Sequence, residues 1–288
     1  MALSLPLYEK ESIMTISRAF SFAGLRRALL LSAVSGLAFM AAAPLAHAYT
    51  LDVPYVPTPA QVVNRMLELA QVGPEDFVID LGSGDGRIAI AAVKDHGAKG
   101  ALGVDLNPER IAEARANAAE AGVTDKVEFR EQNLFDTDFS SASVLTMYLL
   151  PDVNLALRDK ILALEPGTRV VSHAFDMEDW EADVFERVDG RSVHLWIVPA
   201  QVAGHWKLDG PEGGMALELT QVFQNVSGTA QDAGGQSLPV SGSLNGSAIR
   251  LVVGEGEAAR TYTGNVQGSS MLVAAAGSGD HNWKGTRQ

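Results

Sequence analysis

A short apolar run gives way to alternating glycines at Val78-Ile79-Asp80-Leu81-Gly82-Ser83-Gly84-Asp85-Gly86. The apolar residues predict a buried strand, and the glycines predict a sharp turn into a helix. Residues without a Cβ let the backbone approach a ligand closely, and the N–H groups at the start of a helix favour a carboxylate. We therefore expect Asp80, Gly82, Ser83, Gly84 and Gly86 to contribute to a ligand site.

The next predicted strand ends in Val104-Asp105. A carboxylate at this place accepts hydrogen bonds from both ribose hydroxyls of an adenosyl group. The glycines follow a G-x-G-x-G spacing, whereas a dinucleotide-binding loop has G-x-G-x-x-G. Loop and acid together favour an adenosyl ligand other than a dinucleotide, so a nicotinamide-dependent oxidoreductase is the less favoured interpretation.

Strand-like runs alternate with helical patterns around the glycine loop. The runs lie at residues 77–81, 101–104, 127–129, 144–149 and 169–172. The clearest helix runs from Pro108 to Ala121 with Asn107 as its N-cap, and an earlier helix is expected to have Thr58 as N-cap. This alternation predicts an α/β fold, a doubly wound Rossmann-like domain over residues 49–203.

From Gly204 onward, short alternating runs rich in Gly and Ser replace the helices. Residues 240–246 (VSGSLNG) are matched by residues 262–268 (YTGNVQG), and Ile249 is matched by Met271 at the same offset. Repeated hairpins of an antiparallel sheet or small barrel give this pattern. We expect residues 204–288 to form a separate all-β module.

Composition and charge limit the classes of partner. The net charge is −13 at pH 7 with no basic run, which argues against nucleic acid as a substrate because its phosphates would be repelled. A protein or small-molecule partner fits better. The chain has no cysteine, and its six histidines show no metal-ligand spacing, so no metal site is expected.

The N-terminal residues have the pattern of an export signal. Arg26-Arg27 precede an uncharged run that ends before Pro44, and Ala46-His47-Ala48 form an A-x-A site. Residues 1–48 are predicted to be either a signal peptide cleaved after Ala48 or an uncleaved signal anchor. In both cases the remainder lies outside the cytoplasm, exported, periplasmic or anchored in the inner membrane and facing outward. A membrane contact is expected only through an uncleaved leader, and the oligomeric state is left open.

The glycine loop and Asp105 resemble those of class I S-adenosylmethionine-dependent methyltransferases, over roughly residues 53–198. The resemblance implies that the loop surrounds the methionine part of the cofactor. An acid that contacts adenine commonly follows the third strand in that family. Asn133 stands at this position, with the N–H of Leu134 beside it and Asp136 as the alternative acid.

A narrower resemblance comes from Pro54-Tyr55-Val56-Pro57-Thr58 together with residues 80–87 (DLGSGDGR). These segments are similar to the lysine methyltransferases of the ATP synthase c-subunit and adenine nucleotide translocase, and to bacterial members that carry a leader. The resemblance implies that Tyr55 and Thr58 fold over the cofactor and that the acceptor is a protein lysine.

The acceptor side is predicted from topology. Sites in open α/β sheets lie beyond the carboxyl ends of the strands, where Tyr148, His173 and Asp176 are expected. Tyr148 is a candidate wall of the acceptor channel, and His173 or Asp176 is a candidate proton acceptor. Each also has an ordinary structural interpretation, as a packing tyrosine, a core histidine and a turn cap.

Two functions of different classes follow from these observations. The first is an S-adenosylmethionine-dependent methyltransferase with a protein lysine as acceptor. The alternative is an exported binding protein that uses the β module and carries a degenerate methyltransferase-like domain. The intact loop and Asp105 favour the enzyme, and the leader favours the binding protein, because the cofactor is made in the cytoplasm.

Overall fold

The computed structural model describes residues 55–211, 213–277 and 282–288. The predicted leader, residues 1–48, lies outside the described residues. Among the described helices, none combines the length and the apolar content needed to cross a bilayer.

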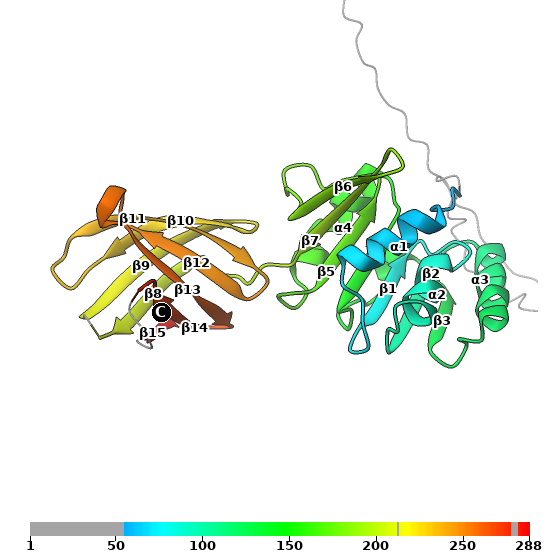
Figure 1. Ribbon diagram of the computed structural model, residues 1–288, viewed down its shortest axis with the longest axis horizontal. Coiled ribbons are helices and arrows are strands. Elements are labelled where there is room, and N and C mark those ends of the chain that lie inside the picture. Colours follow the sequence, from blue (N-terminus) through cyan, green and yellow to red (C-terminus); the bar gives the residue numbers. More distant parts are fainter. Residues whose placement is uncertain (1–54, 212, 278–281) are drawn as a thin grey trace, which may run out of the picture. The chain divides into compact units, whose positions relative to one another are not determined.

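A seven-stranded sheet carries the glycine loop (Figure 1). Its strands are β1 Phe77–Leu81, β2 Gly100–Asp105, β3 Val127–Glu131, β4 Val144–Met147, β5 Arg169–His173, β6 Val184–Val188 and β7 Arg191–Ile197. The order is β3-β2-β1-β4-β5-β7-β6; the first five strands are parallel, and β7 runs antiparallel to both β5 and β6. All five predicted strands are present, whereas the β6–β7 hairpin was not predicted.

Helices cover both faces of this sheet. The helices are α1 Ala60–Leu69, α2 Arg87–Lys94, α3 Pro108–Ala121 and α4 Pro151–Leu162, with a 3-10 turn η1 at Leu134–Asp136. The first three pack against the strands on one face (Figure 1), where Val78, Val144 and Val171 are buried. On the other face Ile79 and Leu145 pack with Leu157 of α4. The doubly wound arrangement predicted from the alternation is confirmed.

The two predicted helix caps have different outcomes. The Asn107 side chain accepts from the N–H groups of Glu109 and Arg110, as expected for the N-cap of α3. Thr58 does not cap α1, because Pro59 is the N-cap residue and no side chain bonds the first N–H groups. The Thr58 hydroxyl instead hydrogen-bonds to the ring of His173, which lies on β5.

The C-terminal residues form a closed antiparallel barrel. Its strands are β8 Gly204–Gly210, β9 Gly213–Val222, β10 Asn225–Gln231, β11 Ser237–Asn245, β12 Ala248–Val253, β13 Arg260–Gln267, β14 Ser270–Ala275 and β15 Asn282–Arg287, with a 3-10 turn η2 at Gly256–Ala258. The sequence repeat corresponds to two hairpins, β11–β12 and β13–β14, whose two-residue turns begin at Gly246 and Gly268. Trp206, Tyr262 and Trp283 are buried in the barrel core.

Gly86 illustrates how the turn from β1 into α2 depends on glycine. Its φ is +81°, and a Cβ there would lie 2.4 Å from Cζ of Phe129 and 2.9 Å from Cβ of Ala114. Gly97, just after α2, has a similar φ of +74° but open space around it. The two positions therefore separate backbone strain from steric conflict.

We expect Gly97→Ala to lower the free energy of unfolding by about 1–2 kcal/mol, the cost of a left-handed conformation. Gly86→Ala should add about 1–3 kcal/mol of overpacking to that cost. The measurement is the urea midpoint of each variant at an unchanged m-value. Equal losses for the two variants would contradict the packing role of Gly86.

Candidate active site

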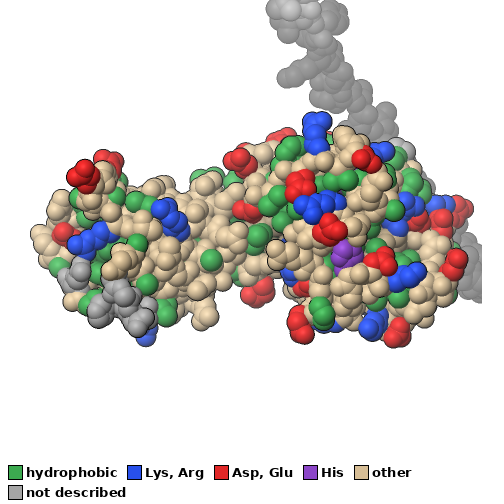
Figure 2. Space-filling model, viewed as in Figure 1, with side chains coloured by type: hydrophobic (Ala, Val, Ile, Leu, Met, Phe, Trp, Pro, Cys, Tyr) green, Lys and Arg blue, Asp and Glu red, His purple; other side chains and the backbone are tan. Residues whose placement is uncertain are grey.

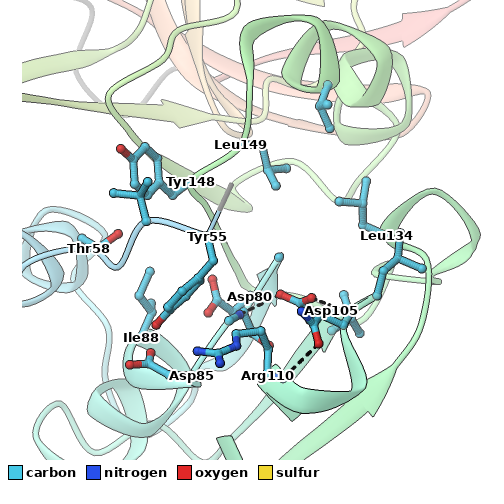
Figure 3. Close-up of a pocket in the computed structure, with 18 of the residues that line it drawn as sticks. Tyr55, Thr58, Asp80, Asp85, Ile88, Asp105, Arg110, Leu134, Tyr148 and Leu149 are labelled. Atoms are coloured by element: carbon cyan, nitrogen blue, oxygen red, sulfur yellow. Dashed lines mark hydrogen bonds between the residues drawn. The ribbon is translucent and has the colours of Figure 1, made fainter. Parts of the chain in front are cut away.

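A cavity of about 300 Å³ lies beyond the carboxyl ends of β1, β2 and β4 (Figure 3). Ten of the residues predicted for the site line it: Tyr55, Thr58, Asp80, Gly82, Ser83, Gly84, Asp105, Asn133, Leu134 and Tyr148. The structure thus brings together residues from five separate segments of the chain. Gly86, Asp136, His173 and Asp176 are not among the lining residues.

The glycine loop is held to β2 by its own N–H groups. Gly82 and Ser83 both donate to the carbonyl oxygen of Val104 at 2.9 Å, and Gly84 donates to Oδ2 of Asp105 at 2.9 Å. These donors are therefore engaged within the protein. At the start of α2 the Asp85 carboxylate accepts from the N–H of Arg87 at 3.3 Å. The glycines act through shape more than through free donors.

Asp105 is oriented from both sides. Oδ2 accepts from Gly84, and Oδ1 accepts from the N–H of Asn107 at 2.8 Å. Each carboxylate oxygen has further lone pairs, so both can still accept a hydrogen bond from a ligand. The carboxylate is fixed before any ligand arrives, as recognition of two adjacent hydroxyls requires.

Asp80 lies on the cavity floor and is buried. Its Oδ1 accepts from the Thr146 hydroxyl at 2.7 Å, whereas Oδ2 has no protein partner. Burial, with a smaller effect of Asp105 and Asp85, raises the pKa of the Asp80 carboxyl to about 7. The hydroxyl of Ser83 is likewise buried without a partner. Two unpartnered polar atoms at the floor fit a ligand that carries polar and cationic groups.

Tyr55 packs over the glycine loop as a cover. A Cβ on Gly84 would lie only 2.4 Å from Cε2 of Tyr55, so the ring needs glycine beneath it. The guanidinium of Arg110 lies 4.7 Å from the ring centroid. Figure 3 shows the Tyr55 hydroxyl directed at Asp85, to which it hydrogen-bonds. Burial first, and then Asp85, raises the pKa of the Tyr55 hydroxyl.

The adenine side of the predicted site is formed by Asn133 and Leu134. The Asn133 amide oxygen already accepts from the N–H of Phe135 at 3.0 Å, because Asn133 is the N-cap of η1. An amide oxygen accepts two hydrogen bonds, so one remains for a ligand amine. The alternative acid, Asp136, is exposed and lies outside the cavity lining.

The three acceptor-side candidates differ in location. Tyr148 lines the cavity on the same side as Thr58 (Figure 3). His173 is fully buried behind it, and burial together with Arg191 lowers the pKa of its imidazole to about 4. Asp176 is exposed, and its Oδ1 accepts from the N–H of Glu178 in a turn. Neither proposed proton acceptor reaches the cavity.

Several lining residues were not predicted. Asp85 and Arg87 belong to the same motif and carry an ion pair with each other, so their position was a usable signal. Arg110 resembles an ordinary solvent-facing charge on α3, and no pattern distinguishes it. Phe135 and Leu150 are exposed and apolar at the cavity entrance, which only the folded arrangement reveals.

The comparisons with known proteins identify the family. A family model described as the ANTKMT methyltransferase domain matches residues 80–184. The protein-lysine N-methyltransferase of Saccharolobus islandicus is 48% identical over 155 residues, which cover 52% of this chain and 96% of the relative. The chain belongs to this methyltransferase family. The methyltransferase uses S-adenosylmethionine, and the alternative of an exported binding protein has no support.

Two further methyltransferases are similar to this chain. The adenine nucleotide translocase lysine N-methyltransferase of Mus musculus is 38% identical over 132 residues, covering 46% of this chain and 57% of that enzyme. A solved structure from Salinibacter ruber, described as an RNA methyltransferase in complex with S-adenosyl-L-homocysteine, is 51% identical with a TM-score of 0.50. It covers 51% of this chain and 96% of that one.

The state of Asp80 gives a pH-dependent prediction. Because its folded pKa is raised, the folded chain keeps a proton that the unfolded chain loses between the ordinary carboxyl pKa and about 7, so stability falls as pH rises through this window. A cationic ligand next to Asp80 favours the ionised form and should expel that proton.

We expect S-adenosylmethionine binding at pH 6.5 to release a fraction of a proton per site. Calorimetry in buffers of different ionisation enthalpy measures it, and Asp80→Asn should remove the Asp80 share while leaving any proton from the ligand itself. Identical proton release in the wild type and Asp80→Asn would contradict the assignment.

Proposed function

We propose that this methyltransferase transfers the methyl group of S-adenosylmethionine to the ε-amine of a lysine in a protein. Two relatives are named for lysine methylation, the Saccharolobus islandicus enzyme and the mouse translocase enzyme. The observation that carries the proposal for this chain is the entrance of the cavity, which has the character of a surface that binds polypeptide.

The entrance is rimmed by exposed apolar side chains. Val56 is 50% exposed, Phe135 46% and Leu150 39%, and all three line the cavity. They come from the cover segment, from η1 and from the loop before α4. Apolar side chains grouped at a binding site gain free energy from contact with other apolar side chains. A polypeptide offers such contacts on both sides of a lysine.

The charges near the rim fit a basic acceptor. Asp136 is the residue directly after Phe135, and Asp152 is separated from Leu150 by one residue. Both acids are exposed. Over the visible face of the described residues, acidic and basic side chains are interspersed (Figure 2). These two acids follow rim residues in the sequence without lining the cavity, and their charge attracts a lysine and repels phosphate. This favours protein over RNA, although the Salinibacter ruber relative is described as an RNA methyltransferase.

Each part of the cofactor can be assigned to particular residues of the cavity. We assign the ribose hydroxyls to Asp105, the adenine edge to Asn133 and Leu134, and the charged methionine end to Asp80 and Ser83. Tyr55 and Thr58 cover the bound cofactor and exclude water. Bound S-adenosylmethionine supplies an electrophilic methyl group on a sulfonium.

Alignment of the amine is the main task left to the protein. Methyl transfer is an in-line displacement, in which positioning contributes several kcal/mol. A lysine has a reference pKa of about 10.4, so its proton must leave before it attacks. We propose that Tyr148 forms the wall along which the amine enters, and that the proton leaves to solvent at the open entrance, since His173 and Asp176 lie outside the cavity.

The test is methyl transfer to lysine-containing proteins and to RNA, each measured with labelled cofactor. We expect label on lysine and none on RNA. Asp105→Ala should raise the cofactor Kd by about tenfold to a hundredfold, because the loss of hydrogen bonds to a charged acceptor costs about 1.5–3 kcal/mol. Asp125→Ala, an exposed acid outside the cavity lining, is the control. Label on RNA alone would overturn the proposal.

The rim is tested within the same experiment. Val56→Asn should raise the acceptor KM by about tenfold, because it places an uncharged polar amide in an apolar contact, and should change the cofactor Kd little. Val222→Asn makes the same change at a valine that is 65% exposed on β9 of the barrel, and should leave both constants unchanged.

We also propose that the methyltransferase acts outside the cytoplasm, on the basis of the export pattern in residues 1–48. In cells that express the full chain, fractionation should recover it in the periplasm or the membrane, and N-terminal sequencing should then find Tyr49 first if the leader is cleaved. Recovery of the intact chain in the cytoplasm would contradict this proposal.

A further inference from the structure

His173 connects two parts of the site without lining the cavity. Its Nδ1 lies 3.0 Å from Oγ1 of Thr58, in a hydrogen bond between two buried side chains. The centroid of its ring lies 3.9 Å from that of Tyr148, at an interplanar angle of 40°. One imidazole therefore contacts the cover segment with one edge and the proposed acceptor wall with its face.

The turn that follows His173 is unusually constrained. Ala174 has a φ of +71°, a conformation that residues other than glycine rarely adopt. The Phe175 N–H donates to the His173 carbonyl at 2.9 Å, and the Ser172 hydroxyl donates to the Phe175 carbonyl at 2.7 Å. Strained backbone persists where the surrounding contacts fix it, and it clusters at functional sites.

Thr58 is held at two points. Besides its hydroxyl on His173, its carbonyl oxygen accepts from Nη1 of Arg87 at 2.7 Å. Arg87 pairs with Asp85, and Asp85 accepts from the Tyr55 hydroxyl. The cover segment 55–58 is thus tied to the glycine loop through Arg87 and to β5 through His173.

The burial and the pKa of His173 argue against a role as proton acceptor. His173 is fully buried, and its Nε2 has no protein partner. With a pKa of about 4 it is neutral near pH 7 and a poor proton acceptor. It is also not among the residues that line the cavity, whereas its contacts Tyr148 and Thr58 are. A neutral buried ring that contacts two cavity residues serves to hold them.

We propose that His173 is a positioning residue that fixes Thr58 over the cofactor and Tyr148 along the acceptor path, so that cofactor binding and acceptor alignment depend on the same side chain. The first half of this proposal concerns cofactor binding alone. The second half, the alignment of the acceptor, rests on the proposed function of Tyr148.

Two substitutions separate the two contacts. His173→Phe keeps a ring against Tyr148 and removes the hydrogen bond to Thr58. His173→Asn keeps a polar group near the position of Nδ1 and removes the ring. Thr58→Val removes the same hydrogen bond from the other side, and Thr58→Ser retains the hydroxyl. The control for loss of a buried hydroxyl is Thr168→Val. Thr168 is buried and directly precedes the first residue of β5, whereas His173 is the last.

For cofactor binding, measured by calorimetry on the full chain, His173→Phe and Thr58→Val should each raise the S-adenosylmethionine Kd by about three- to tenfold. The double variant should bind no more weakly than the weaker single one, because both remove one shared bond. Thr58→Ser should restore binding, and Thr168→Val should not affect it. Additive effects in the double variant would overturn the connection. This result needs no acceptor.

For catalysis, His173→Asn should leave the Kd near the wild-type value and lower kcat by about tenfold or more, since misalignment of the amine is costly. The pH profile of kcat should keep its shape. Loss of an ionisation from that profile would overturn the positioning role by making His173 a proton acceptor. Thermal unfolding of each variant shows whether a change reflects folding instead. If no lysine acceptor is found, the calorimetric cycle still decides the first half.

Discussion

The site depends on the attachment of the glycine loop to the end of β2. Two N–H groups of the loop converge on the carbonyl of Val104, and a third is bound by Asp105. Because these donors are engaged, the loop keeps its shape without a ligand, and Asp105 keeps its orientation. Tyr55 can lie directly on Gly84 only because the loop is fixed in this shape. The Tyr55 cover, the Asp105 carboxylate and the cavity floor therefore share one support.

A second constraint is the crowding of acids on the floor. Asp80, Asp85 and Asp105 all line the cavity, and only Asp85 has a cationic partner, Arg87. Arg87 holds the pKa of the Asp85 carboxyl below its ordinary value despite burial, whereas the pKa of Asp80 is raised. Charge that is unfavourable in the free protein becomes favourable when a cationic ligand enters. The floor therefore selects for positive charge as well as for shape.

The sequence was most informative where local chemistry decides the outcome. The loop, the five parallel strands, the Asn107 cap and the β hairpins follow from glycine spacing, apolar runs and side-chain caps. The β6–β7 hairpin was missed although Asp189-Gly190, both with positive φ, is a strong turn signal. The Thr58 hydroxyl was assigned to a local cap because its real partner, His173, is distant in sequence. The apolar rim has no local signature either, since it is assembled from three segments.

The closed barrel and the open seven-stranded sheet differ in whether another chain can add a strand to them. Each of its eight strands is paired on both sides, so the backbone offers no free edge to an added strand, and a partner must recognise its side chains and loops. The seven-stranded sheet, by contrast, ends in β3 and β6. The β6 edge carries alternating Phe185 and Arg187 on the outward side, with Glu186 paired to Arg65 of α1. Charged residues along such an edge disfavour pairing between copies, so strand addition is limited by closure in the barrel and by side-chain charge at β6.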